Sequence, residues 1–192
     1  MTTIVIAEDE AIIRLDLREL LEEEGYVVVG EAGRGDQAVE LVRQLTPDLV
    51  ILDVKMPGMD GIEAARRITS EGICAVLMLT AFSQREIVEQ ARDAGAVAYL
   101  VKPFQKAELV PAIELATARY AETRALVSEV SELTERLEVR KLLDRAKGLI
   151  IDAHGMKESD AFSFIQKSAM TQRTTMRAIA ESILKGELVP PA

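Results

Sequence analysis

Apolar runs alternate with segments of helical periodicity along the first half of the chain. The clearest run, Leu49 to Leu52, has no polar alternation and is typical of a strand buried on both faces of a parallel sheet. Between the runs, apolar residues recur every three or four positions, and Gly or Pro often ends the segment. The pattern predicts strands at 4–7, 26–29, 48–53, 74–79 and 97–101, and helices at 11–24, 36–45, 61–70 and 84–93. Such alternation indicates right-handed crossovers and an α/β fold, a doubly wound parallel sheet of five strands.

A long helix follows the sheet domain. From Ala112 to Val139 the sequence contains neither Gly nor Pro, so we expect the helix to continue without a break. Four apolar residues within it are spaced four, three and four apart, namely Leu126, Val130, Leu133 and Leu137. This heptad seam either joins two chains as a coiled coil or packs on its own chain.

The rest of the chain predicts a small unit of three helices. One helix closes at His154-Gly155, a second runs from Lys157 to about Ala169, and Thr174 is the expected N-cap of a third that ends near Gly186. Residues 190–192 are expected to form a frayed tail. We place the domains at 1–120 for the sheet, 121–140 for the helical linker and 141–192 for the three-helix unit.

Composition adds two limits to this picture. The net charge of −9 argues against broad, non-specific binding of nucleic acid. The charge is uneven, because the stretch from Lys141 to Ala192 has eight Lys or Arg and six Asp or Glu, whereas the rest has 15 and 26. The two parts are therefore expected to have different partners.

The sequence also predicts where the protein is found. A single cysteine, Cys74, excludes an internal disulfide and favours a reducing compartment. No basic segment leads into a long apolar run at the N-terminus, and no stretch approaches the about 18 apolar residues of a membrane span. We expect a cytoplasmic protein without a secretion signal or a membrane segment.

Polar residues follow four of the predicted strands, at what must be one edge of the sheet. They are Glu8 and Asp9, Asp53, Thr80 and Lys102. Each alone has a plain reading as a helix cap, a surface lysine or a strand-end threonine. Together, three clustered carboxylates call for a cation, and oxygen ligands with open water positions suit Mg²⁺. Asp53 could then attack a phosphoryl donor, with Mg²⁺ and Lys102 holding the charge and Thr80 bonding the product.

The first domain resembles the receiver domain of bacterial two-component response regulators, over about residues 3–120. The residues that carry the resemblance are Ala7 to Glu10, Asp53 to Gly61, Leu79 to Ala81 and Ala98 to Phe104. The resemblance implies a flavodoxin-like fold and phosphorylation of Asp53 by a sensor histidine kinase. It makes Asp9 the principal Mg²⁺ carboxylate with Glu8 assisting, and the carbonyl of Lys55 a further ligand. It makes Thr80 and Tyr99 the switch pair, and Lys102-Pro103 a cis peptide.

The residue at position 55 distinguishes a receiver domain from a phosphate-transferring hydrolase. Hydrolases that pass through an aspartyl phosphate often carry a second Asp two residues after the nucleophile, as their acid and base. Here that position is Lys55, so rapid turnover is not expected. We expect a phosphoacceptor that catalyses its own phosphorylation and slow dephosphorylation, not an enzyme acting on other molecules.

The last helices resemble the ANTAR domain, an RNA-binding output module of three helices, over about residues 132–185. The matching segments are Arg145 to Ile150, His154 to Met156, Asp160 to Phe162 and Ile179-Ala180. The resemblance implies binding to RNA stem-loops in nascent transcripts, so that a terminator fails to form. Candidate RNA contacts are Lys147, Arg145, Arg173 and Arg177; a solvated helix face is the alternative for each.

The whole chain thus looks like an antitermination response regulator of the actinobacterial type, expected to form a homodimer on phosphorylation. Two other outputs remain open. One is a DNA-binding helical domain, against which the chain offers no clear helix-turn-helix and little positive charge. The other is a protein-interaction module that binds an enzyme or another regulator.

Overall fold

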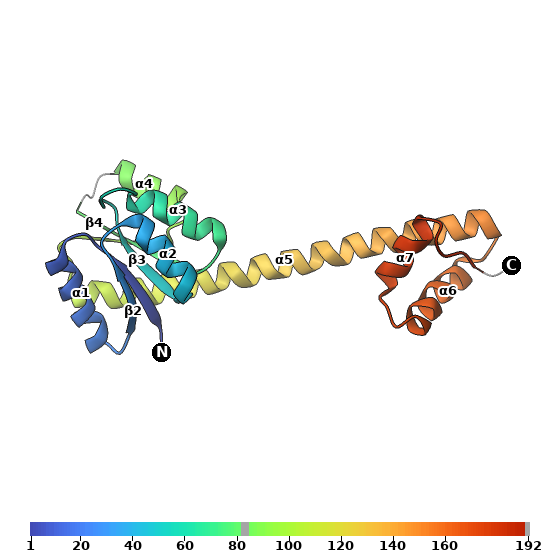
Figure 1. The fold of residues 1–192 in the computed structure, drawn as a ribbon, viewed down its shortest axis with the longest axis horizontal. Coiled ribbons are helices and arrows are strands. Elements are labelled where there is room, and N and C mark those ends of the chain that lie inside the picture. Colours follow the sequence, from blue (N-terminus) through green and yellow to red (C-terminus); the bar gives the residue numbers. More distant parts are fainter. Residues whose placement is uncertain (82–84, 191–192) are drawn as a thin grey trace. The chain divides into compact units, whose positions relative to one another are not determined.

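Five parallel strands form the sheet in the order β2-β1-β3-β4-β5 (Figure 1). The computed structural model describes residues 1–81 and 85–190. The strands are β1 Thr3–Ala7, β2 Val27–Ala32, β3 Leu49–Asp53, β4 Ala75–Thr80 and β5 Ala98–Val101. The strand order and the parallel pairing confirm the predicted doubly wound α/β fold.

Helices cover both faces of the sheet, as the unbroken apolar strands require. They are α1 Ala11–Glu23, α2 Gly35–Leu45, α3 Gly61–Glu71, α4 Arg85–Asp93 and α5 Lys106–His154. Ile4 and Ile6 of β1 face a core shared with α1 and the first turns of α5, whereas Val5 and Ala7 face a core shared with α2, α3 and α4. Figure 1 shows α1 and the start of α5 on the opposite side of the sheet from α2 and α3. Period-2 alternation thus gives each strand two buried faces.

The second unit has its own small core. The chain divides into Met1–Arg124 and Ala125–Ala192, and in the latter the last turns of α5 pack with α6 Glu158–Thr171 and α7 Met176–Leu184. The fully or nearly fully buried side chains are Ala146, Ile150, Ala161, Ile165, Ala169, Ile179, Ala180 and Ile183. Small and branched aliphatic residues allow three short helices to approach closely. No helix in the described part of the chain is long and apolar enough to cross a membrane.

The seam of Leu126, Val130, Leu133 and Leu137 is exposed. Each of the four side chains is between 51% and 63% accessible within the chain. In the structure, this face of α5 therefore does not pack on its own chain. An apolar stripe left in water on a helix fits a coiled coil between chains.

Several element limits differ from those predicted. Strand β2 continues to Ala32 because it lies at the edge of the sheet, where Glu31 remains partly accessible. Helix α5 is one helix of 49 residues, so the predicted linker helix and the first helix of the three-helix unit are continuous. The cap of α7 is Thr175, whose Oγ1 accepts a hydrogen bond from the Ala178 amide, because Thr174 closes α6 by donating to the Ala169 carbonyl.

Two predictions fall at the margins of the described residues. The predicted start of the fourth helix at Gln84 lies outside them. The expected tail is wrong at Pro190, which is buried, and residues 191–192 lie outside the described part.

The turn after β3 depends on a glycine. Gly61 opens α3, and its amide donates to the Val54 carbonyl at 2.9 Å. A Cβ at this position would lie 1.9 Å from the carbonyl oxygen of Asp53. Only a residue without a side chain lets α3 begin so close to the end of β3.

We predict that Gly61→Ala destabilises the first unit by about 1–3 kcal/mol, because the backbone of Asp53 must move. All three tyrosines lie between residues 1 and 124 and the chain has no tryptophan, so tyrosine fluorescence during urea unfolding reports on this unit alone. Gly33→Ala is the matched control, since its nearest neighbour would be an arginine nitrogen at 3.8 Å. Equal unfolding midpoints for the two variants would contradict the prediction.

Candidate functional site

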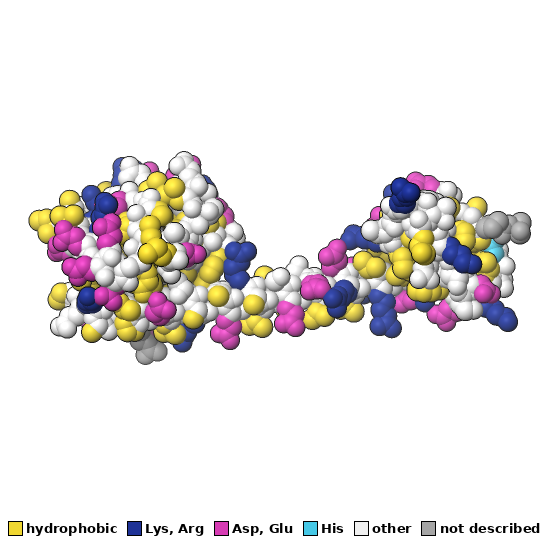
Figure 2. Space-filling model, turned by 90° about the horizontal axis from the view of Figure 1, so that it is seen from below, with side chains coloured by type: hydrophobic (Ala, Val, Ile, Leu, Met, Phe, Trp, Pro, Cys, Tyr) yellow, Lys and Arg dark blue, Asp and Glu magenta, His cyan; other side chains and the backbone are white. Residues whose placement is uncertain are grey.

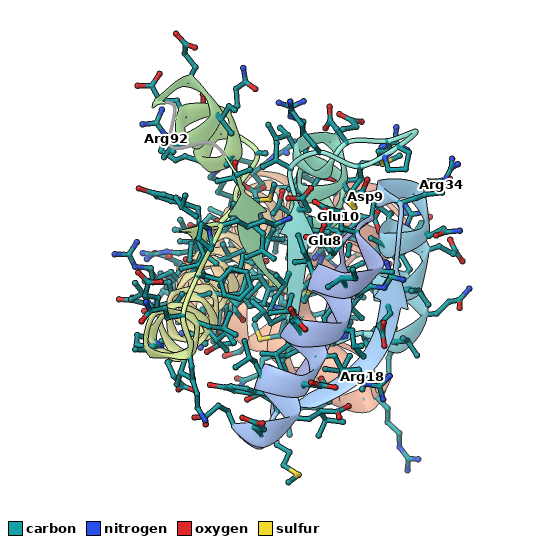
Figure 3. The ribbon with its side chains drawn as sticks, turned by 90° about the vertical axis from the view of Figure 1, so that its left-hand side faces the viewer. Glu8, Asp9, Glu10, Arg18, Arg34 and Arg92 are labelled. Atoms are coloured by element: carbon teal, nitrogen blue, oxygen red, sulfur yellow. The ribbon has the colours of Figure 1, made fainter. Side chains whose placement is uncertain are left out.

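The predicted site residues meet at the carboxyl edge of the sheet. Glu8 and Asp9 follow β1, Asp53 ends β3, Thr80 ends β4 and Lys102 follows β5. Figure 3 shows Glu8, Asp9 and Glu10 together where β1 passes into α1. Since β1, β3, β4 and β5 are neighbours in the order β1-β3-β4-β5, parallel pairing alone brings these positions to one edge.

The ammonium group of Lys102 links two of the acids. Its Nζ lies 2.8 Å from Oδ1 of Asp53 and also donates to Oε2 of Glu8. The Lys102 side chain is 12% accessible and that of Glu8 is fully buried. Two carboxylates therefore share one cation in a largely dehydrated place, where an ion pair is strong but a missing partner is costly.

The pKa values reflect this arrangement. Burial raises the pKa of the Glu8 carboxyl, and the hydrogen bond from Lys102 opposes that rise. Burial disfavours the charged form of Lys102, yet its hydrogen bonds to Asp53 and Glu8 keep the pKa of the ammonium above its ordinary value. Lys102 is thus held in the charged form, as a group that meets negative oxygens must be.

The three carboxylates are arranged as a possible cation site. One oxygen each from Glu8, Asp9 and Asp53 lies within 4.8 Å of the other two. Asp9 is exposed, Asp53 is 6% accessible and Glu8 is buried, so the cluster opens to solvent on the Asp9 side. Carboxylates with an open side are the donor set that suits Mg²⁺.

The loop after β3 shapes the surroundings of Asp53. Its Oδ2 accepts a hydrogen bond from the Lys55 amide at 3.1 Å. Lys55 is exposed, and this hydrogen bond places its backbone beside the carboxylate. The peptide bond between Lys102 and Pro103 is cis, as predicted.

Thr80 and Tyr99 occupy different environments. Thr80 is 2% accessible at the end of β4, next to β3 and β5. Tyr99 lies on β5, where it pairs with Met78, and its side chain is 51% accessible. Tyr99 also lines a groove of about 380 Å³ with residues of α4 and α5. Thr80, at the same sheet edge as the acids, is therefore buried, whereas Tyr99 is exposed to solvent.

Arg14 supports the site and was not predicted from the sequence. Its Nη1 donates to the carbonyl of Glu8 at 2.6 Å, and its Nε donates to Glu31 at 3.2 Å. It thereby fastens the end of β1 to α1 and β2. In the sequence Arg14 reads only as a charged helix residue, so no local signal indicates this contact.

The four predicted RNA contacts come from three different elements of the second unit. The Lys147 side chain is only 16% accessible, and its Nζ lies 2.9 Å from both Asp144 and Glu158. Arg177 lies 3.0 Å from Glu181. Arg145 on α5 and Arg173, in the left-handed turn after α6, are both exposed. Lys147 thus joins α5 to α6, while the three arginines are exposed.

Comparisons with known proteins agree with both halves of this description. The family model of the response regulator receiver domain matches residues 4–114, and that of the ANTAR domain matches residues 131–184. The chain is 60% identical over 182 residues to the transcriptional regulatory protein PdtaR of Mycobacterium tuberculosis, covering 95% of this chain and 89% of the relative. It is 40% identical over 111 residues to the chemotaxis protein CheY of Bacillus subtilis, covering 57% and 92%.

A solved structure gives the same result for the first unit. The signal receiver domain of the response regulator NarL from Mycobacterium tuberculosis superposes with a TM-score of 0.59 at 34% identity, covering 61% of this chain and 96% of that one. The acidic edge, the lysine bridge and these matches lead to one conclusion. The chain belongs to the two-component response regulators that join a receiver domain to an ANTAR domain.

Proposed function

We propose that Asp53 accepts a phosphoryl group from a sensor histidine kinase. In response, the second unit of the chain, called the ANTAR unit from here on, binds RNA and acts as a transcription antiterminator. The observation that carries the first part is the position of Asp53, which contacts the Lys102 ammonium and clusters with the carboxylates of Glu8 and Asp9. The second part rests on membership of the ANTAR family.

The transfer needs little from the protein beyond positioning. An Asp53 carboxylate oxygen attacks the phosphorus of a phosphohistidine, the P–N bond breaks, and the leaving imidazole takes up a proton. Asp9, Asp53 and the Lys55 carbonyl, with Glu8 in support, would hold Mg²⁺, and the ion would supply positive charge opposite the phosphoryl oxygens. Lys102, already charged and desolvated, contacts the same oxygens, and the Thr80 hydroxyl bonds one of them.

The acyl phosphate is expected to last. Its hydrolysis needs a base close to Asp53 that prepares a water molecule, and the residue two positions on is Lys55 rather than an acid. The chain therefore catalyses its own phosphorylation and only slow dephosphorylation. A long-lived signal suits a regulator whose output is binding.

RNA stem-loops in nascent transcripts are the proposed ligands of the ANTAR unit. RNA loops present unstacked bases and local phosphates, which a few well-placed cations can meet, whereas a DNA duplex requires an extended basic surface. The mild positive balance after Lys141 fits the former. The relative PdtaR is named a transcriptional regulatory protein, which agrees with an output on transcripts. Its place of action, with the polymerase, is the cytoplasm.

The exposed seam of α5 supports a homodimer. Burying four aliphatic side chains that are now more than half accessible favours association, and heptad spacing provides the geometry. Phosphorylation acts on the receiver, into whose core the first turns of α5 pack. Movement of Thr80 toward the phosphoryl group and of Tyr99 into the freed space is the proposed switch.

Asp53→Asn is predicted to abolish phosphorylation by acetyl phosphate and Mg²⁺, because the amide is no nucleophile. Intact-mass spectrometry measures the phosphorylated fraction. Asp9→Asn, which keeps the nucleophile but removes a metal ligand, should slow the reaction and raise the Mg²⁺ requirement. Asp93→Asn, an exposed acid at the end of α4, is the control. Undiminished modification of the Asp53 variant would refute the assignment.

Leu133→Glu is predicted to shift the protein toward monomer, because a charge would be buried without a partner in the seam. Ser131→Glu adds the same charge two positions earlier, on the solvent side of the heptad, and should leave the assembly unchanged. Light scattering of both variants, with and without phosphorylation, gives the mass. A dimer in the Leu133 variant equal to that of wild type would exclude the seam.

Phosphorylation is predicted to increase the affinity for a stem-loop RNA by about 5- to 150-fold, the usual range of coupling between two sites. The measurement is a titration of the phosphorylated and unphosphorylated chain at one fixed salt concentration, with the Asp53→Asn variant as the unphosphorylatable control. Equal RNA affinities of the phosphorylated and unphosphorylated chain would contradict the proposed control by phosphorylation. Absence of RNA binding in both states would contradict the proposed antitermination function.

A further inference from the structure

A groove of about 330 Å³ lies between the last part of α5 and the start of α6, within the second unit. Its lining consists of three apolar residues, three cations and one acid, namely Val139, Leu143, Phe162, Arg136, Arg140, Lys147 and Asp144. None of the receiver residues takes part in it. Figure 2 shows basic and apolar side chains exposed side by side on this unit.

Phe162 is exposed because of its position on α6. Ala161 and Ile165, one turn apart, point into the core and are fully buried, so the residue after Ala161 falls beside the core. Phe162 is 42% accessible and lines the groove. Phe164, on the same helix, packs against the core instead. An aromatic ring at the wall of a cationic groove is a stacking platform.

The three cations differ in their availability. Lys147 is held by Asp144 and Glu158, and Arg136 lies 2.6 Å from Glu132. Among the described residues, Arg140 forms no salt bridge, although it lies close enough to the Asp144 carboxylate, whose hydrogen-bonding partner is Lys147, to interact with it electrostatically. Arg140 is therefore the cation that can bind an incoming anion without giving up a partner.

The same face of α5 changes character at this groove. Arg140, Asp144 and Lys147 continue the spacing of the seam after Leu137, by steps of three, four and three. The apolar seam thus ends at Leu137, and charged residues take the following positions. A second α5 helix finds no apolar match there, which leaves the groove for another ligand.

We propose that this groove binds one unpaired base of an RNA loop, stacked on Phe162, with an adjoining phosphate on Arg140. The inference rests on the proposed RNA output and names the surface that performs it. An aromatic face, an apolar floor and an unpaired cation match a base with its phosphate, since unstacked bases occur in loops and phosphates adjoin them. A paired stem offers no such base.

The test uses the full chain and a pool of hairpin RNAs with a randomised loop, compared with a loop-free duplex RNA of the same stem. Phe162→Leu keeps the apolar volume and removes the ring, so affinity for the pool should fall about 5- to 140-fold. Phe162→Tyr should retain it. Arg140→Ala should weaken binding and reduce the slope of log affinity against log salt by ~0.7, as for one lost phosphate contact.

The controls lie on the same helix outside the groove. Met170→Ala removes an apolar side chain that is 74% accessible, and Lys167→Ala removes an exposed cation. Both should leave the affinity for the hairpin pool nearly unchanged. Thermal melting of each variant confirms its fold, and Arg140→Ala, a change at an exposed site, provides a second test if Phe162→Leu melts early.

The outcomes separate this inference from the proposed function. If Phe162→Leu and Arg140→Ala bind the hairpin pool as tightly as wild type does, the assignment of the groove is wrong, whereas the proposed binding of RNA is retained. If wild type binds no RNA, both fail. If the variants lose dimer mass in light scattering but retain RNA affinity, the occupant is a second copy of the chain, which also overturns the inference.

Discussion

A single ammonium group between two carboxylates is the constraint on which the receiver site depends. Glu8 is fully buried and Asp53 nearly so, and without Lys102 their charges would repel each other in a largely buried place. The lysine must therefore project across the carboxyl edge of the sheet from β5 past β4. That requirement fixes the end of β5 relative to β1 and β3, and with it the geometry of the acceptor.

The sheet edge was predictable because topology alone creates it. Once the strands are known to be parallel and the chain to wind through helices, the residues after β1, β3, β4 and β5 must meet. Apolar runs such as Leu49 to Leu52 define those strands without knowledge of any contact. Thr80, Asp53 and Lys102 were accordingly placed correctly at the edge from sequence, although their roles remain proposals.

Contacts set by side-chain direction were not predictable. The donation from Arg14 to the Glu8 carbonyl depends on the rotation of α1 against β1, which charge and spacing do not encode. Lys147 was one of the RNA candidates, yet it is bound by acids from α5 and α6, and only the packing of the two helices reveals this. Phe162 lay inside a matched motif, but whether it faced the core or solvent depended on the helix phase set by Ala161 and Ile165.

Helix α5 carries residues of both cores, and its middle has none. Leu109, Ile113 and Ala116 are buried in the receiver, Ala146 and Ile150 in the ANTAR unit, and every residue from 121 to 138 is exposed. Without helix on either side, this segment would have to form its own nucleus, which is costly, and pairs such as Arg136 with Glu132 add only about 0.2–0.5 kcal/mol. Here the flanking turns, fixed by their cores, already provide the nucleus. The middle of α5 is thus stabilised from its two ends and by whatever covers the seam, so a change at either core or at the seam alters the stability of the same segment.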